Sequence, residues 1–169
     1  MKYRMITGVL LAFTVVAPVR AAVSVKTSIE LLAEISTSVR VYVNSKDVTN
    51  SAFSLKLEDN SGYMTATTPA FQFIGNASSV SLSLSGPGNN ELISENNDRM
   101  RLNTTWVRVD GGESSTSFGY NNLLVYPSLS DVPDLQKGIK VRFISSQRTE
   151  TYPLGSYSGT FNVIVTPSV

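Results

Sequence analysis

The sequence of 169 residues contains no cysteine, no histidine and a single tryptophan. The absence of histidine and cysteine removes the usual nucleophile and base pairs of enzymes and the commonest ligands of transition metals. The absence of cysteine also excludes disulfide bonds, so the stability of the fold must come from packing and strand pairing. We therefore expect a structural or binding protein with no enzymatic activity, no metal and no cofactor.

Long apolar runs are also lacking, with one exception at the N-terminus. There, Lys2 and Arg4 precede an apolar stretch from Met5 to Val16, and Val19-Arg-Ala21 follows with small or branched side chains at the cleavage subsites. This pattern predicts a secretory signal peptide over residues 1–21. The apolar stretch is shorter than the ~20 residues that a membrane-spanning helix needs, and no later segment qualifies, so we expect export without membrane insertion.

Neither sign of charge is in large excess. The whole sequence has 14 basic and 13 acidic residues, and removal of residues 1–21 takes away Lys2, Arg4 and Arg20, which leaves 11 basic residues against 13 acidic ones. The resulting weakly negative mature chain is a poor match for nucleic acid or for an anionic membrane surface. We expect neither as a partner.

The most regular feature that is present is the stretch Val23–Val43. Its eleven odd-numbered positions are all apolar or threonine, whereas its even-numbered positions are mostly polar. A period of two is typical of a strand with one buried face. The capping pattern Thr27-Ser-Ile-Glu30 would also suit a short helix, but the alternation extends well beyond it and the flanks are β-branched, which favours a strand.

This stretch is too long to be one straight strand of a small domain. It would extend about 70 Å at ~3.3 Å per residue, whereas a body made of the rest of the chain is only about 40 Å across. One interpretation is a long first strand interrupted by a bulge. The other is that its N-terminal part leaves the domain and adds a strand to another molecule, in which case the accepting domain must lack one strand of its own.

Short alternating segments separated by turn signals make up the rest of the chain. The expected strands lie at Phe53–Leu57, Phe71–Ile74, Val80–Leu84, Met100–Trp106, Leu123–Tyr126, Ile139–Phe143 and Tyr157–Val165, with turns at 44–51, 59–62, 75–76, 86–88 and 110–112. The connections 92–101 and 127–138 are expected to be less regular. A series of short strands without a long helix predicts an all-β sandwich.

Trp106 is the side chain with the best chemistry for contact with a ligand. It ends one of the predicted strands, and an exposed indole there would stack on a sugar ring. A place in the core or in a cross-strand pair is the favoured interpretation of a large aromatic residue in a strand.

The N-terminal pattern resembles a known family. Val25-x-x-x-Ile29-x-Leu31-x-Ala33-x-Ile35-x-x-x-Val39-x-Val41 is similar, without a gap, to the mature N-terminus of the major pilins of the colonization factor antigen I group, the alpha clade of chaperone-usher fimbriae. A looser similarity runs through Phe53 and Leu55, Phe71–Asn76, Leu102-x-x-x-Trp106 and Gly155-x-Tyr157-x-Gly159-x-Phe161-x-Val163-x-Val165. It covers most of the chain after residue 21, and its two ends are the specific parts.

The resemblance implies an incomplete immunoglobulin-like β-sandwich that is completed by a donor strand from a neighbouring subunit. In that family a periplasmic chaperone lends the missing strand, and an outer-membrane usher exchanges it for the N-terminal extension of the next subunit. The donor-strand residues implied here are Val25, Ile29, Leu31, Ala33 and Ile35. The implied partners are neighbouring pilin subunits in a homopolymer, the chaperone, the usher and a tip adhesin.

The expected organisation is a signal peptide over 1–21, a donor-strand extension over 22–36 and a pilin β-sandwich domain over 37–169. The family has a proline between the extension and the first strand of the domain, whereas this chain has Thr37, so no bend is assumed there. The expected function is that of a structural subunit of an adhesive surface fimbria. The alternative is a monomeric secreted carbohydrate-binding β-sandwich domain that uses Trp106.

Cleavage of the signal peptide is expected after Ala21, because cleavage after Ala22 would place Arg20 at a subsite that requires a small residue. Mass spectrometry and N-terminal sequencing of the exported protein should therefore find Ala22 as its first residue. A retained leader or a chain that begins at Val23 would contradict this prediction.

Overall fold

The computed structural model describes residues 37–108, 113–115 and 119–168. The chain divides into two units, Met1–Glu34 and Ile35–Val169, and every described residue belongs to the second unit. The predicted signal peptide and donor-strand extension therefore lie outside the described residues. None of the helices in the described ranges is long and apolar enough to cross a membrane.

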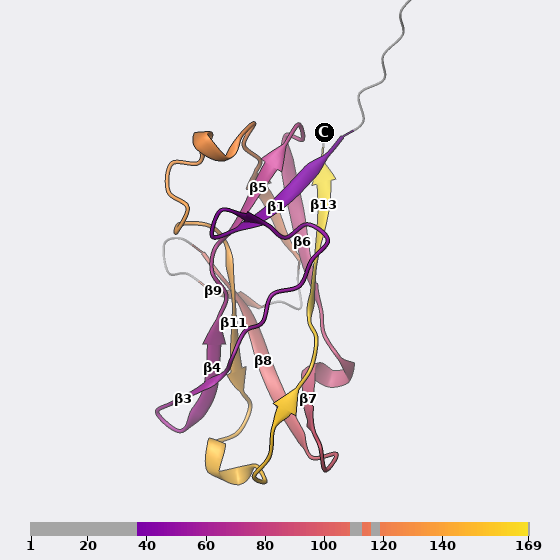
Figure 1. The fold of residues 1–169 in the computed structure, drawn as a ribbon, viewed down its shortest axis with the longest axis vertical. Coiled ribbons are helices and arrows are strands. Elements are labelled where there is room, and N and C mark those ends of the chain that lie inside the picture. Colours follow the sequence, from indigo (N-terminus) through magenta and orange to yellow (C-terminus); the bar gives the residue numbers. More distant parts are fainter. Residues whose placement is uncertain (1–36, 109–112, 116–118, 169) are drawn as a thin grey trace, which may run out of the picture. The chain divides into compact units, whose positions relative to one another are not determined.

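The described part of the chain consists of short strands joined by turns and by 3-10 helices (Figure 1). The strands are β1 (Val39–Val43), β2 (Lys46–Asp47), β3 (Glu58–Asn60), β4 (Tyr63–Thr67), β5 (Phe71–Gly75), β6 (Ser79–Ser85), β7 (Glu91–Ser94), β8 (Arg99–Val107), β9 (Glu113–Ser115), β10 (Tyr120–Leu124), β11 (Lys140–Ser145), β12 (Tyr157–Ser158) and β13 (Asn162–Ser168). The 3-10 helices are η1 (Gly88–Asn90), η2 (Leu129–Asp131) and η3 (Thr149–Thr151). This architecture confirms the predicted all-β fold of immunoglobulin-like sandwich type.

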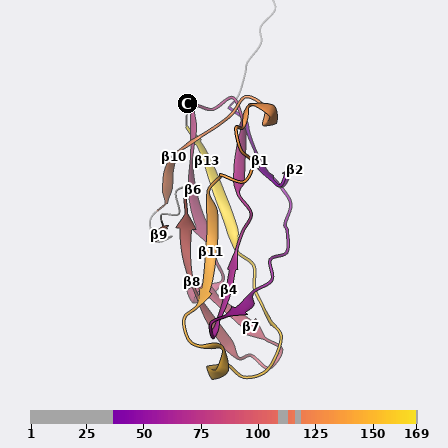
Figure 2. The same ribbon diagram turned by 90° about the vertical axis from the view of Figure 1, so that its left-hand side faces the viewer.

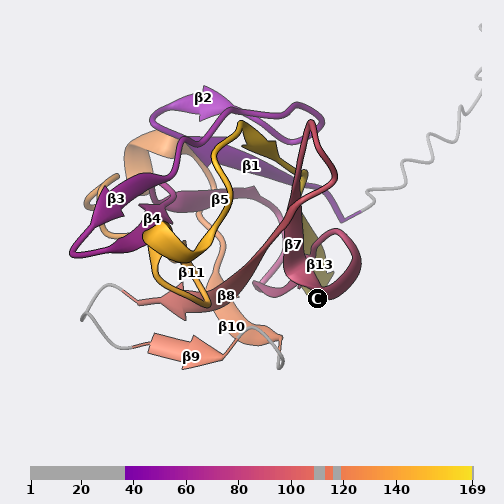
Figure 3. The same ribbon diagram turned by 90° about the horizontal axis from the view of Figure 1, so that it is seen from below.

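The strands form three sheets. The first has the order β2-β1-β5, the second β10-β6-β13 and the third β12-β7-β8-β11-β4-β3, with β9 also paired to β8. The ladders between these strands are antiparallel. Seen from below, the strands curl around a shared interior, with β1 and β5 on the opposite side of it from β8 (Figure 3).

Strand β8 shows how the period of two in the sequence builds the core. Met100, Leu102 and Trp106 point inward and are buried, while the residues between them face outward over the first half of the strand. On the neighbouring β11, Val141 lies opposite Trp106 in the ladder and is also fully buried. The same alternation that identified these strands in the sequence therefore places their apolar side chains on one face.

The start of β1 is held firmly against the turn between β5 and β6. The Ser38 N–H donates to Asn76 Oδ1 at 2.7 Å, and the Asn76 N–H donates to the Ser38 carbonyl at 3.1 Å. A side chain at Gly75 would collide with the Ser38 carbonyl, so only glycine permits this approach of the two backbones. The point at which the chain enters the domain is thus defined by hydrogen bonds.

The domain has two ends, which Figures 1 and 2 show from two sides. The proximal end holds the start of β1, the end of β13 and η2, and there the Ser78 N–H donates to the Ser168 carbonyl at 3.0 Å. The distal end holds the β3–β4 turn, the β7–β8 turn and η3, and there the Thr149 N–H donates to the Gly62 carbonyl at 2.8 Å. The strands run between these two ends.

The prediction of a strand at Phe53–Leu57 is wrong. Residues 51–57 have no regular secondary structure, and β3 begins only at Glu58. The side chains alternate as in a strand, but no described neighbour pairs with this backbone, and alternation alone does not make a ladder. The alternation correctly predicted which side chains face the core, but it did not predict that the segment has no neighbouring strand among the described residues.

The expected irregular connection 92–101 is also corrected. It contains β7 and the start of β8, joined through a turn in which Asn97 has a φ of 64°. By contrast, the connection 127–138 is irregular as expected and holds η2. The predicted turn at 110–112 lies outside the described residues, although β8 and β9, which lie before and after it, pair antiparallel.

Trp106 should tolerate loss of its indole nitrogen. Its exposed fraction is 0%, and Nε1 has no hydrogen-bond partner in the described part of the chain. We expect Trp106→Phe to lower the free energy of unfolding by ~1–2 kcal/mol and Trp106→Ala by ~3–5 kcal/mol, because only the second leaves a large cavity. Urea unfolding of both variants tests this prediction, and equal losses would contradict it.

Candidate functional site

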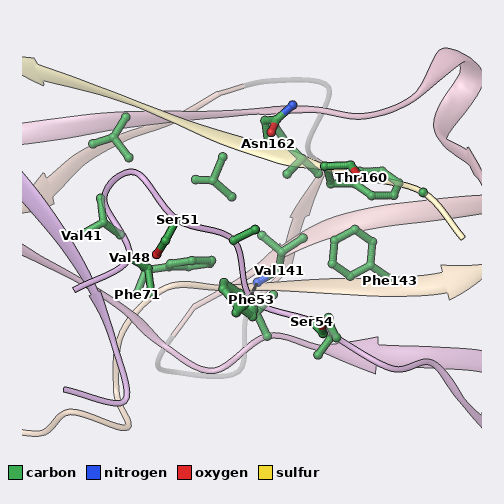
Figure 4. A pocket seen from close by; sticks show the side chains of 18 of the residues that line it. Val41, Val48, Ser51, Phe53, Ser54, Phe71, Val141, Phe143, Thr160 and Asn162 are labelled. Carbon is green, nitrogen blue, oxygen red and sulfur yellow. Dashed lines mark hydrogen bonds between the residues drawn. The ribbon is translucent and has the colours of Figure 1, made fainter. Parts of the chain in front are cut away.

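An open groove of about 890 Å³ lies along the domain between β13 and the segment that joins β2 to β3. Its floor is formed by side chains from the second and third sheets, among them Leu84, Leu102, Val141 and Phe143. Figure 4 shows Val141 and Phe143 between Phe53 on one side and Asn162 on the other. The groove thus opens directly onto the hydrophobic core.

Strand β13 forms one wall of the groove. One of its edges pairs with β6 over its whole length, from Asn162 opposite Ser85 to Ser168 opposite Ser79. Its other edge has no ladder partner among the described residues. Val163 and Val165 point inward from this strand yet stay half-buried, because nothing described covers their outer side.

The segment 48–57 forms the opposite wall. The Val48 N–H donates to the Val41 carbonyl at 2.8 Å, which ties the beginning of the segment to β1. Residues 52–57 make no backbone-to-backbone hydrogen bond within the described part of the chain. Leu55 and Leu57 nonetheless pack against the core, and the Phe53 ring lies 6.2 Å from the ring of Phe71.

Both walls therefore present backbone groups without ladder partners and side chains that are only half covered. Fourteen apolar residues pack against the core while staying partly exposed, and ten of them line the groove. They are Val39, Val41, Val48, Leu55, Leu57, Leu84, Tyr157, Phe161, Val163 and Val165. Most of the partly buried apolar side chains that pack against the core therefore line this groove.

The groove is uncharged. No aspartate, glutamate, lysine or arginine lines it, and its polar lining residues are serine, threonine, asparagine and tyrosine. A ligand that fits must bring apolar side chains for the floor, and it must bring N–H and C=O groups for the walls. An extended peptide with apolar residues at alternate positions meets both requirements, because it presents side chains to one face and backbone groups to both edges.

The turn at Asp47–Thr49 sets the position of the segment 48–57. The Thr49 hydroxyl and the Thr49 N–H donate to Asp47 Oδ1 at 2.6 and 3.0 Å, and the same hydroxyl accepts the Val41 N–H at 3.0 Å. The side-chain hydrogen bond from Thr49 lowers the pKa of Asp47, with smaller contributions from the Thr49 N–H and from Arg40, whose Nη1 lies 3.6 Å away. The hydroxyl thus links β1 to the beginning of the groove wall.

The residues proposed from the sequence fall into two groups. Val25, Ile29, Leu31, Ala33 and Ile35 lie outside the described residues. Trp106 is fully buried, and its ring meets that of Tyr120 edge-on at 6.5 Å. A buried indole does not offer its face to a sugar, so the core role of Trp106 replaces the ligand contact considered for it.

The residues of the groove walls were not assigned to a site by the sequence. Strand addition implies that the acceptor domain lacks one strand. The sequence did not predict which strands would lie on either side of that empty position. Phe53, Leu55 and Leu57 carried the usable signal, because they alternate like a strand and have a long polar turn on one side. In the described residues no group of acidic side chains is placed to hold a metal ion.

These features define an all-β sandwich domain with an open apolar groove along one side. No protein-family model matches the chain, and no curated protein sequence matches it. A solved structure of a chaperone-tip adhesin complex, described as vital for synergistic activation of CFA/I fimbriae biogenesis, contains a chain similar to this one, with 17% sequence identity and a TM-score of 0.48. The similarity covers 77% of this chain and 42% of that chain.

Replacing Thr49 should release the restraint on Asp47. We expect Thr49→Val to raise the pKa of Asp47 toward its ordinary value in an NMR titration, and Thr49→Ser, which keeps the hydroxyl, to leave it lowered. Because a lowered carboxyl pKa stabilises the fold above the ordinary pKa, this contribution is constant at neutral pH and is lost only below about pH 4. An unchanged pKa in Thr49→Val would contradict the assignment.

Proposed function

We propose that this protein is a structural subunit of an adhesive surface fimbria, and that its groove accepts the N-terminal extension of another copy. The single observation that supports this most is a strand position between β13 and segment 52–57, above an apolar floor, that no described residue fills. We assign the protein no catalytic role, since the whole sequence contains no histidine and no cysteine.

The extension 22–36 has the properties that the groove requires. Val25, Ile29, Leu31, Ala33 and Ile35 occupy odd positions and would face the floor together in an extended strand. Burial of each large side chain contributes ~1.5–3 kcal/mol, and main-chain hydrogen bonds to both walls would set the register. The extension contains one lysine and two glutamates, all at even positions, which would face solvent.

The lengths also agree. The run from Val25 to Ile35 spans eleven residues, and the wall from Tyr157 to Pro167 spans eleven residues as well. A segment of this length extends about 36 Å, which is comparable to the length of such a domain. One extension would therefore fill the groove, and each copy would offer one groove and one extension, so that copies link into a chain.

A subunit with an open groove would need protection before it meets its neighbour. An unpaired strand edge beside exposed apolar side chains is prone to aggregate. The proposal therefore includes a periplasmic chaperone that occupies the groove transiently, and an outer-membrane usher at which the exchange takes place, as in the family that the N-terminus resembles. The protein would be exported by its signal peptide and displayed at the cell surface, with a tip adhesin as a further partner.

The alternative of a monomeric sugar-binding domain receives no support from the position of Trp106. The indole lies in the core, where its face is not available to stack on a sugar ring.

The proposal is tested by giving the chain its own strand. The self-complemented chain carries a second copy of residues 22–37 after Val169, joined by a linker of about four residues. We expect the mature chain to polymerise and the self-complemented chain to remain a monomer whose Tm is higher by more than ~10 °C, because several large side chains become buried. Size-exclusion chromatography and thermal unfolding measure both properties.

The matched control carries Asn in place of Ile29, Leu31 and Ile35 in the added copy only. It has the same length and linker but cannot fill the apolar floor, so it should behave like the mature chain. A mature chain that is already a stable monomer, with a Tm that neither addition changes, would refute the proposed function.

A further inference from the structure

Leu154 is the most exposed of the large apolar side chains in the described residues, at 97%. It lies at the distal end, in the loop between η3 and β12. This loop is braced, because the Tyr157 hydroxyl donates to the Pro153 carbonyl at 2.9 Å and the rings of Tyr152 and Tyr157 meet edge-on at 6.3 Å. A single exposed leucine is ordinary on a protein surface, so its position in an assembly has to decide its role.

A short connection would limit where the next copy sits, if the proposed function holds. When Ile35 occupies the groove of one copy, Ser36 and Thr37 remain before Ser38, which is bonded to Asn76 at the proximal end of its own domain. Three Cα-to-Cα steps of 3.8 Å reach at most about 11 Å. The proximal end of the donating copy must therefore lie against whichever end of the groove the strand leaves.

The direction of the strand decides which end that is. In one direction the proximal ends of donor and acceptor would meet. The acceptor's own extension also begins at its proximal end and is equally short, so the preceding copy would have to occupy the same place. Three domains would then crowd around one end. In the other direction the strand leaves the groove at the acceptor's distal end. The proximal end of each copy then contacts the distal end of one neighbour, and each end makes a single contact.

The second direction also suits the strand pairing. β13 runs toward the proximal end, where Ser168 lies beside Ser78. An inserted strand that runs from the proximal to the distal end is antiparallel to β13, and an antiparallel ladder is slightly more stable than a parallel one.

Contact between a proximal end and a distal end already follows from donor-strand exchange between copies, and we propose that in this polymer the contact covers Leu154. The occupant is thus a second copy of this chain. Its proximal end offers apolar side chains on and around η2, namely the half-buried Leu129 and Val132 and the exposed Leu124. This contact rests on the proposed function, but it is a separate surface from the groove.

The absence of cysteine from the natural sequence makes a cross-linking test clean. The double variant Leu154→Cys, Ser130→Cys places one thiol at each end, with Ser130 exposed in η2. Polymers of the mature double variant are treated with a long thiol-specific cross-linker and analysed on denaturing gels. We expect a ladder of covalent multimers from the double variant and only monomers from each single variant.

Other outcomes overturn the inference. Dimers from Ser130→Cys alone would show that proximal ends meet each other, and dimers from Leu154→Cys alone would show the same for distal ends. An intact polymer that gives no cross-link in any variant would show that the two ends are not in contact. If electron microscopy finds no polymer before cross-linking, the proposed function itself fails, and the inference fails with it.

A pair of serine variants separates contact from folding. The side chain of Ile164 is 50% exposed, does not line the groove and lies away from both ends, so it serves as the matched control. We expect Leu154→Ser to shorten polymers at least twofold without changing the Tm of the self-complemented monomer, and Ile164→Ser to leave polymer length unchanged. Equal polymer lengths for Leu154→Ser and the parent chain would count against the contact.

Discussion

The edge of β13 that no described residue pairs with is the constraint on which the rest of this structure depends. A β-sandwich is complete only when backbone groups at its edges are paired or solvated and its core is covered from every side. Here one edge of β13 is paired with β6, and Val163 and Val165 remain half-buried beside the other. In the described part of the chain, the groove lies between this edge of β13 and the segment 52–57, which has no ladder partner there either.

Segment 52–57, on the opposite side of the groove, also packs against the core without strand pairing in the described part of the chain. Leu55 and Leu57 alternate like strand residues and pack against the core, yet the backbone between them has no ladder partner in the described part of the chain. A strand inserted beside β13 would lie next to this segment. The turn at Asp47 and Thr49 holds the beginning of the segment to β1, so the wall keeps its place while the space beside it stays open.

Under the proposed function, recognition and mechanical linkage come from the same strand. The alternating side chains of residues 25–35 would supply burial, and the backbone would supply register. The hydrogen bonds between Ser38 and Asn76 would then mark the boundary at which the extension ends and the domain begins. An assembly built in this way transmits force through strand pairing, and it does so without a covalent link between copies.

Much of the fold could be predicted from the sequence. A strand with one buried face has apolar residues at every second position, and this alternation is visible in the sequence. Met100, Leu102 and Trp106 identified β8, and the lack of cysteine and histidine narrowed the chemistry. Local patterning does not report pairing, so Phe53–Leu57 read as a strand although it has no partner, and the regular pairing of β7 with β8 was missed. Sequence alone therefore determined most of the core strands and their buried faces, and it led to the expectation that the N-terminal strand is exchanged. Only the tertiary structure decided which edges border the gap and that Trp106 is buried, because both depend on contacts between residues far apart in the chain.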